Sequence, residues 1–292
     1  MSLAHRAAGT VAAPTPARRG GRRARAGIAL GIGAGTLWLS LIVLIPIAAI
    51  IATSFDNGIG AFWNAISADA AVSALQTTVV TSIIVTVINA VVGVQIAWVL
   101  TRDSFAGKRI LDALIDLPFA LPTIVASIVL LSLYGPASPV GIHLQHTKTA
   151  LVIALLFVTL PFVVRTVQPV IIELERESEQ AAETLGANRA TILRRIVFPS
   201  LAPALLSGAG LAFSRAIGEF GSLVLIGGGI PKHTEVSSQY IRSLIEQDSP
   251  QEAAAVAVVL LTLSFATLFV LRVTADRLSR REAPSHAING GR

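Results

Sequence analysis

Six long runs of apolar residues divide the chain, and shorter polar or charged stretches separate them. Each run is long enough for an α-helix to cross the hydrocarbon core of a bilayer, which takes about 20 residues. The pattern predicts an all-α integral membrane protein with six transmembrane helices. We expect these spans at Ile28–Ile51, Thr77–Leu100, Ala113–Tyr134, Thr149–Ile172, Ser200 to about Gly228, and Ala253 to about Val273.

Prolines interrupt the third predicted span. Pro118 and Pro122 should kink this helix and free backbone carbonyls, which only protein or a wet cavity can satisfy. A flexing helix that lines a cavity and a fixed kink fit this pattern equally well. In the fourth span, Arg165 lies near the cytoplasmic end, where we expect its side chain to snorkel to the membrane surface.

The composition supports the membrane assignment and excludes other classes of protein. Of the 292 residues, 53% are hydrophobic and only 14% are charged, whereas about a quarter are charged in soluble domains. Cysteine is absent, which excludes a disulfide framework, a thiol nucleophile and a thiolate metal site. The net charge of +6 does not indicate a nucleic-acid partner, because Lys and Arg fall in blocks between the apolar runs.

These blocks of positive charge orient the spans. Most Lys and Arg residues lie on one side of the predicted topology, namely six Arg in residues 1–26, then Arg102, Lys108, Arg109, Arg176, Arg189, Arg194, Arg195, Arg272, Arg277, Arg280, Arg281 and Arg292. The opposite side has only Lys148, Lys232 and Arg242. The positive-inside rule therefore places both termini in the cytoplasm of a multi-pass cell-membrane protein.

The same pattern divides the chain into three parts. Residues 1–26 predict a disordered basic cytoplasmic tail, residues 27–276 the transmembrane domain, and residues 277–292 a cytoplasmic C-terminal tail. The first apolar run is too long for the h-region of a signal peptide, so we interpret it as a retained span.

Two short helices are predicted in the external connections. Ile59, Phe62, Trp63 and Ile66 recur at helical spacing, which is typical of an interfacial helix with an aromatic anchor. A second short helix is expected around Gln239–Ile245.

A charged segment rich in small residues, at 173–199, lies between the fourth and fifth spans on the predicted cytoplasmic side. One face of a first helix has residues at spacings of three and four, namely Leu174, Ser178, Ala181, Ala182 and Leu185. Gly186 follows where a helix stop needs a positive φ, and Asn188 is a good N-cap for a second helix. Pro199 is expected to end that second helix and lead into the fifth span.

Two helices joined at a glycine corner are suited to docking, because a small-residue face lets another backbone approach closely. The segment has no Ser-His pair, paired acids or metal-ligand set, so it is not a catalytic loop. The residues alone leave an amphipathic connector lying on the membrane equally open.

The stretch QAAETLGANRATILRRIVFP resembles the Ala-Ala-xxx-Gly loop in permease subunits of ATP-binding-cassette (ABC) importers. The positions that carry this resemblance are Gln180, Ala181, Ala182, Gly186, Ile196 and Pro199. Gln180 departs from the Glu of the family pattern, with Glu179 just before it. The resemblance implies the ABC type-1 transmembrane fold, with its core at about 73–276, and a coupling helix that docks on a separate ATPase subunit.

The resemblance further implies a non-catalytic subunit, and we assign it no cofactor or metal site. The chain has no G-x-x-x-x-G-K-[ST] loop, so the ATPase subunit would bind ATP. The other implied partners are a second homologous permease of the W type, an extracytoplasmic sulfate-binding protein and membrane lipid, with no nucleic acid. A stand-alone secondary carrier and a non-transport scaffold are the rival classes, and neither needs a docking corner.

Two further stretches indicate the substrate. DLPFALPTIVASIVLLSLYG, from Asp116, and SRAIGEFGSLVLIGGGIP, from Ser214, resemble the sulfate/thiosulfate permeases, most closely the T type. This resemblance covers about residues 28–280 and implies import of the anion by alternating access. Molybdate permeases share a GEFG version of the second stretch, so molybdate or tungstate import is the alternative.

Arg215 and Glu219 lie four residues apart in the predicted fifth span, and hence on one helical face. Charges in a membrane are costly, so both should face the bundle interior and pair. A structural staple, a contact to the partner permease, and a pathway or gate pair in which Arg215 meets the anion all fit this pattern.

Overall fold

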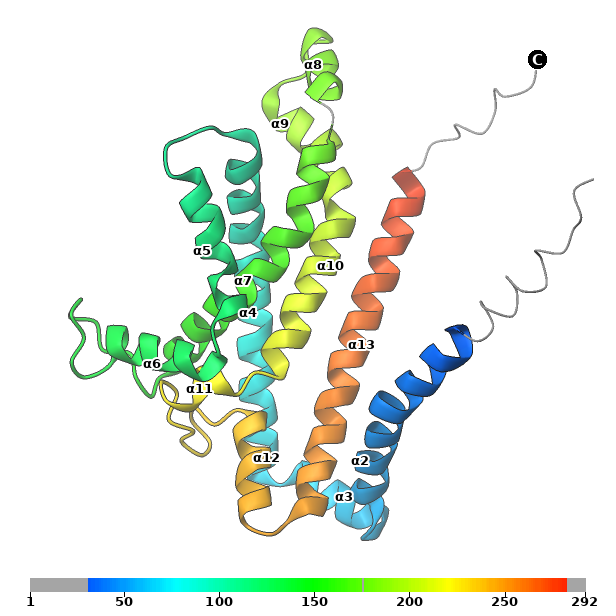
Figure 1. The fold of residues 1–292 in the computed structure, drawn as a ribbon, viewed down its shortest axis with the longest axis vertical. Helices are drawn as coiled ribbons and strands as arrows, with labels where there is room; N and C mark the ends of the chain where they lie inside the picture. Colours follow the sequence, from blue (N-terminus) through cyan, green and yellow to red (C-terminus); the bar gives the residue numbers. More distant parts are fainter. Residues whose placement is uncertain (1–30, 175, 283–292) are drawn as a thin grey trace, which may run out of the picture. The chain divides into compact units, whose positions relative to one another are not determined.

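The computed structural model describes residues 31–174 and 176–282, and every regular element in these ranges is helical (Figure 1). The chain forms two compact units, residues 1–49 and 50–292. In the first unit, residues 31–49 form one helix that includes the π-helical turn η1 (Ser40–Leu44) and the start of α2 (Ile45–Phe55). The predicted tail at 1–26 lies outside the described residues.

Five helical segments in the described ranges are long and apolar enough to cross a membrane, and a bent pair of helices makes a sixth if it is counted as one span. The long segments are residues 31–55, α4 (Asp69–Arg102), α7 (Lys148–Glu173), residues 189–217, and α13 (Pro250–Glu282), of which residues 250–278 pass this test. The bent pair is α5 (Lys108–Ala120) and α6 (Thr123–Tyr134). These elements confirm the all-α prediction and give five candidate spans, or six if the bent pair is one span.

The third predicted span is broken rather than gently kinked. The axes of α5 and α6 differ by 117°, and the break falls at Leu121 and Pro122. Leu121 is extended, with φ −88° and ψ 134°, as expected for a residue that precedes proline. Pro118 lies inside α5 and does not end it. Only the second of the two prolines therefore redirects the chain.

The core lies where α4 and α10 (Phe198–Ile217) pack on α7. A Cβ on Gly93 of α4 would come within 2.8 Å of Val163 on α7, and a Cβ on Gly208 of α10 would come within 3.1 Å of the same residue. Both glycines thus allow close contact between helix backbones. Asn89 of α4 donates to Thr159 Oγ1 of α7 over 2.8 Å, which adds a buried polar link between these helices.

The shorter elements confirm two predictions and correct two boundaries. α3 (Gly58–Ser67) and α12 (Ser237–Glu246) are the expected short helices. α4 begins at Asp69 rather than Thr77, directly after α3, so part of the predicted external connection is helical. The fifth span ends at Ile217 instead of near Gly228, and the short helix α11 (Gly221–Val224) follows it.

Candidate coupling segment and buried charge pairs

α8 (Arg176–Thr184) and α9 (Arg189–Ile192) form the predicted helix–corner–helix at one end of α7 and α10, far from α12 (Figure 1). Gly186 has φ 83°, and its N–H donates to Glu183 O over 2.9 Å. The next N–H, of Ala187, donates to Ala182 O over 3.0 Å, so the turn closes with bonds typical of a helix C-terminus. Asn188 Oδ1 accepts from the Thr191 N–H over 2.8 Å, as expected for an N-cap.

The outer surface of this segment is open to solvent. Gln180, Ala181 and Gly186 are exposed, and Leu185 is 88% exposed. Ala182 is turned inward and packs against the core cluster beneath the segment. One side of α8 thus packs on the core, while its other side and Leu185, which follows α8, are exposed to solvent.

The last two predicted coupling residues, Ile196 and Pro199, lie away from the corner on a helix that is continuous from 189 to 217. Pro199 does not end the second helix, contrary to the prediction. The helix widens into the π-helical turn η2 (Leu193–Val197), in which the Phe198 N–H reaches back to Leu193 O. A π-helical turn can accommodate proline within a helix, because proline lacks an N–H and its ring crowds the carbonyl four residues earlier. The turn η1 precedes Pro46 in the same way.

An ion pair ties α8 to α4, and the sequence analysis did not identify it. Arg102 Nη2, at the end of α4, lies 2.6 Å from Glu179 Oε1 and 3.2 Å from the carbonyl oxygen of Leu174. The guanidinium also stacks 5.2 Å above the Trp98 ring. The two charged side chains are only 11% and 22% exposed. Glu179 therefore faces the core, while its neighbour Gln180 faces solvent. The only sequence signal was a Glu displaced by one position from the family pattern.

The predicted pair Arg215–Glu219 is present as a contact between the Arg215 guanidinium and the Glu219 carboxylate. Glu219 lies beyond the end of α10 at Ile217, so the pair bridges a helix end rather than lying on one helical face as predicted. The Glu219 side chain is 1% exposed and that of Arg215 34% exposed. The carboxylate is sequestered, and the guanidinium remains partly accessible.

Two further hydrogen bonds fix Glu219 to neighbouring elements. Its Oε1 accepts the Ser222 N–H at the start of α11 over 2.8 Å, and its backbone carbonyl accepts from Ser238 Oγ of α12 over 2.7 Å. α11 in turn lies directly on α6, since a Cβ on Gly221 would clash with Thr123 Oγ1 at 2.2 Å. The GEFG stretch thus joins α10, α12 and the bent pair α5–α6.

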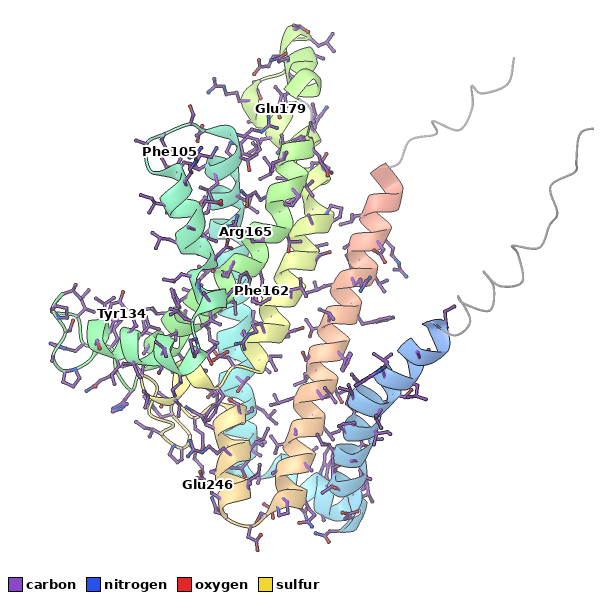
Figure 2. The ribbon with its side chains drawn as sticks, in the orientation of Figure 1. Phe105, Tyr134, Phe162, Arg165, Glu179 and Glu246 are labelled. Carbon is purple, nitrogen blue, oxygen red and sulfur yellow. The ribbon has the colours of Figure 1, made fainter. Side chains whose placement is uncertain are left out.

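Arg165 of α7, labelled in Figure 2, forms a hydrogen-bond network with α5, rather than snorkelling as predicted. Its Nε and Nη2 each donate to one carboxylate oxygen of Asp116 over 2.7 Å. Its Nη1 donates to Asp112 Oδ1 over 2.7 Å and to Gln168 Oε1 over 2.6 Å. Snorkelling is unnecessary because two carboxylates on α5 supply the counter-charge.

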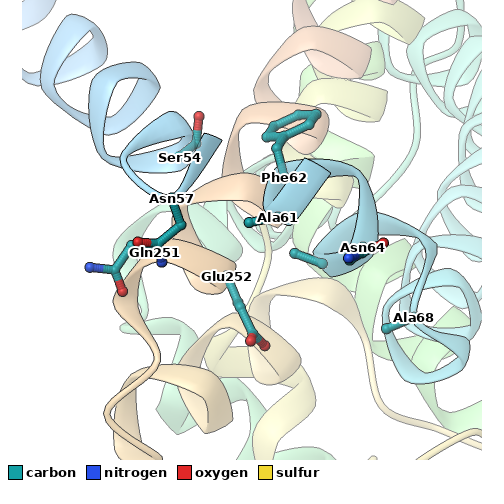
Figure 3. Close-up of a pocket in the computed structure, with 9 residues that line it drawn as sticks. Ser54, Asn57, Ala61, Phe62, Asn64, Ala68, Gln251 and Glu252 are labelled. Carbon is teal, nitrogen blue, oxygen red and sulfur yellow. The ribbon is translucent and has the colours of Figure 1, made fainter. Parts of the chain in front are cut away.

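A polar pocket of about 320 Å³ lies between the end of α2, α3 and the start of α13 (Figure 3). Its polar lining comes from Ser54, Asn57, Asn64, Gln251 and Glu252, and its aromatic lining from Phe62. None of the predicted site residues lines it.

Two titratable groups near α12 are perturbed. Burial raises the pKa of Glu235, which is 8% exposed. Burial also raises the pKa of Tyr240, and the charges of Glu252 and Glu235 raise it further.

Comparison with known proteins agrees with this arrangement. Residues 92–281 match the family model of the binding-protein-dependent transport system inner membrane component. The sulfate transport system permease protein CysT of Salmonella typhimurium is 38% identical over 267 residues, covering 89% of this chain and 96% of that protein. CysT of Escherichia coli is 39% identical over the same shares of the two chains.

Solved structures share the fold. A bacterial alginate ABC transporter, crystallised with an alginate-bound periplasmic protein, has a chain that matches with a TM-score of 0.72 at 14% identity, covering 89% of this chain and 96% of that one. The methionine transporter MetNI matches with a TM-score of 0.56 at 18% identity, covering 72% of this chain and 96% of that one. At this identity the likeness concerns the fold alone. The sequence matches go further, and by them the chain belongs to the family of binding-protein-dependent transport system inner membrane components.

Proposed function

We propose that this chain is the transmembrane permease subunit of an ATP-driven importer of sulfate or thiosulfate, with no catalytic activity and no cofactor of its own. The observation that carries the proposal is the exposed corner formed by α8, Gly186 and α9, in a chain whose relatives are named sulfate permeases. A carrier driven by an ion gradient, or a scaffold, has no need of such a corner.

The proposed mechanism is alternating access. A separate ATPase subunit binds ATP and receives the exposed surface of α8 around Gln180, Ala181 and Leu185. Movement of this segment passes into α10, because the helix from 189 to 217 is continuous through η2. At the other end of α10, the Arg215–Glu219 pair would change its surroundings as the cavity turns from one side of the membrane to the other.

The remaining partners follow from the same proposal. A second homologous permease of the W type would complete the pathway, lipid would cover the apolar outer surface, and an extracytoplasmic sulfate-binding protein would deliver the anion at the end near α12. This arrangement requires both termini and the segment 173–199 in the cytoplasm, as the Lys and Arg distribution predicts. The named relatives favour sulfate over molybdate or tungstate.

The proposal is tested by deleting the gene in a strain without other sulfate importers and measuring uptake of labelled sulfate. Thiosulfate, molybdate and tungstate serve as competitors, and the native chain is supplied back on a plasmid. We expect sulfate uptake to be lost on deletion, restored by the native chain, and abolished when the ATPase subunit is absent. Uptake that survives loss of the ATPase would indicate a secondary carrier, and loss of molybdate uptake alone would reassign the substrate.

A further inference from the structure

The contact between α4 and α8 rests on one partly buried cation. Arg102 is the last residue of α4, and its guanidinium meets Glu179 of α8, the carbonyl of Leu174 at the end of α7, and the face of Trp98. A charge this far removed from water is tolerated because all of these groups compensate it. Removing one charged partner would leave the other without its main compensation.

This contact also sets the rotation of α8. Consecutive residues on a helix lie about 100° apart, so Glu179 and Gln180 point in different directions. Because Glu179 is held against α4, Gln180 and Ala181 are turned to solvent on the surface that we assign to ATPase docking. Ala182, on the inner side, supplies only a small apolar contact with the core. The ion pair is the specific link that can resist rotation.

α4 is well placed to receive motion from α8. Ala97 and Leu100, close to Arg102 on α4, are buried in one cluster with Val163 and Val167 of α7 and Leu201 of α10. Along the covalent chain, α8 leads only to α7 on one side and to α9 and α10 on the other. The ion pair adds α4, a third helix of the core, to the elements that α8 can move.

We propose that Arg102 and Glu179 are positioning residues that link the coupling segment to α4 and so convert ATPase movement into movement of the core. This inference rests on the proposed function, because it assumes that an ATPase docks on α8. Under this inference Glu179 faces the inside of the subunit, and its neighbour Gln180 is the polar residue that is available to the ATPase.

The test uses the complete importer, purified with its ATPase subunit and reconstituted in proteoliposomes with the binding protein. Arg102→Gln, Glu179→Gln and the double variant are compared with the native chain. Three quantities are measured: the amount of ATPase subunit that co-purifies, the rate of ATP hydrolysis, and the number of labelled sulfate ions imported per ATP. Lys108→Gln is the matched control, because Lys108 is a cation close to Arg102 in the chain whose Nζ donates to the exposed carbonyl of Asp103.

We expect both single variants to retain the ATPase subunit and to hydrolyse ATP, while sulfate imported per ATP falls at least about threefold. The double variant should be no worse than either single one, because both substitutions break the same link. Arg102→Lys should recover part of the loss, and Lys108→Gln should cause none.

Unchanged sulfate import per ATP in both single variants would overturn the inference, as would additive losses in the double variant. Loss of ATPase co-purification in the single variants would also overturn it, because the pair would then support docking instead of transmission. If the native chain itself neither binds an ATPase nor imports sulfate, the proposed function fails, and that result is visible before any variant is compared.

Discussion

Arg165 on α7 donates two parallel hydrogen bonds of 2.7 Å to Asp116 on α5, from Nε to Oδ1 and from Nη2 to Oδ2. This bidentate geometry is one of the strongest hydrogen-bonding arrangements between a guanidinium and a carboxylate. It fixes the first half of the bent pair to α7 at a point just before the chain breaks at Leu121. The direction of α5 therefore depends on a polar contact as much as on apolar packing.

Replacing Arg165 with Gln should destabilise the subunit by about 1–3 kcal/mol, the cost typical of losing hydrogen bonds to charged groups. The lower end of this range is expected, because the Asp112 and Asp116 side chains are 42% and 50% exposed. Thermal unfolding in detergent should shift down by about 2–4 °C for each kcal/mol. Arg242→Gln, in the exposed pair with Glu246, should lower the free energy of unfolding by less than about 1 kcal/mol. Equal shifts in the two variants would show that the Arg165 network adds no stability.

At Gly186, the backbone conformation and not the available space selects glycine. Its φ is 83°, yet a Cβ at this position would touch nothing within 4 Å. Gly186→Val should therefore disrupt the corner, since the left-handed region costs an ordinary residue about 1–2 kcal/mol and a β-branched residue more. We expect ATPase co-purification and sulfate uptake to fall while membrane insertion stays normal.

Gly186→Asn is the matched control for this variant, because asparagine enters the left-handed region more readily than other residues. It should keep most of the ATPase association. Loss of association in both variants would point to a tight fit of the ATPase against Gly186, and normal association in both would refute the docking role of the corner.

Leu185 offers a direct test of docking and orientation. Its side chain is 88% exposed, and the chain contains no cysteine, so Leu185→Cys would be the sole thiol in this subunit. An impermeant maleimide should label it only from the cytoplasmic side, and a bound ATPase subunit should protect it. Ile245→Cys, 60% exposed on α12, should react from the opposite side and without protection. Labelling of both from one side would contradict the predicted topology.

The helices and the glycine corner could be predicted because they depend on local patterns. Apolar length defined the spans, helical spacing defined α3, and a positive φ was correctly expected at Gly186. Proline was a less reliable guide. Pro122 breaks the third span, whereas Pro118 and Pro199 lie inside helices, the latter next to the widened turn η2. Whether a proline bends, breaks or is absorbed depends on neighbouring hydrogen bonds that the sequence pattern does not contain.

The charged links were harder to predict because their partners are distant in the chain. Arg102 and Glu179 lie 77 residues apart, and Arg165 and Asp116 lie 49 apart. Nothing in the local pattern distinguishes Arg165 from a residue that snorkels. Arg215 and Glu219 were found because they lie four residues apart, although a helix end separates them.

A double variant can distinguish a structural role of the Arg215–Glu219 pair from a role in the transport pathway. Arg215→Gln alone leaves a carboxylate that is 1% exposed without its cation, and Glu219→Gln alone leaves the guanidinium without its counter-charge. Each should lower the thermal midpoint, whereas the double variant should recover most of the stability. Sulfate uptake then decides the role. Recovery of uptake with stability would identify a staple, and continued loss of uptake in a stable double variant would identify a pathway role, which is the result we expect.

Glu235 should make stability depend on pH in a defined direction. Burial raises its pKa above the ordinary value of 4.5, so the folded protein binds this proton more tightly than the unfolded chain does. The stabilising contribution of the protonated group is complete below about pH 4.5 and is lost as the pH rises through the raised, folded-state pKa.

Glu235→Gln keeps a neutral side chain at every pH, so it should be stabilising relative to the native chain at pH 7 and nearly neutral at the lowest pH. Thermal midpoints in detergent between pH 4.5 and 8 measure this difference, with Glu246→Gln as the control because that side chain is 60% exposed. A difference that does not change with pH would mean that Glu235 titrates alike in the folded and unfolded states.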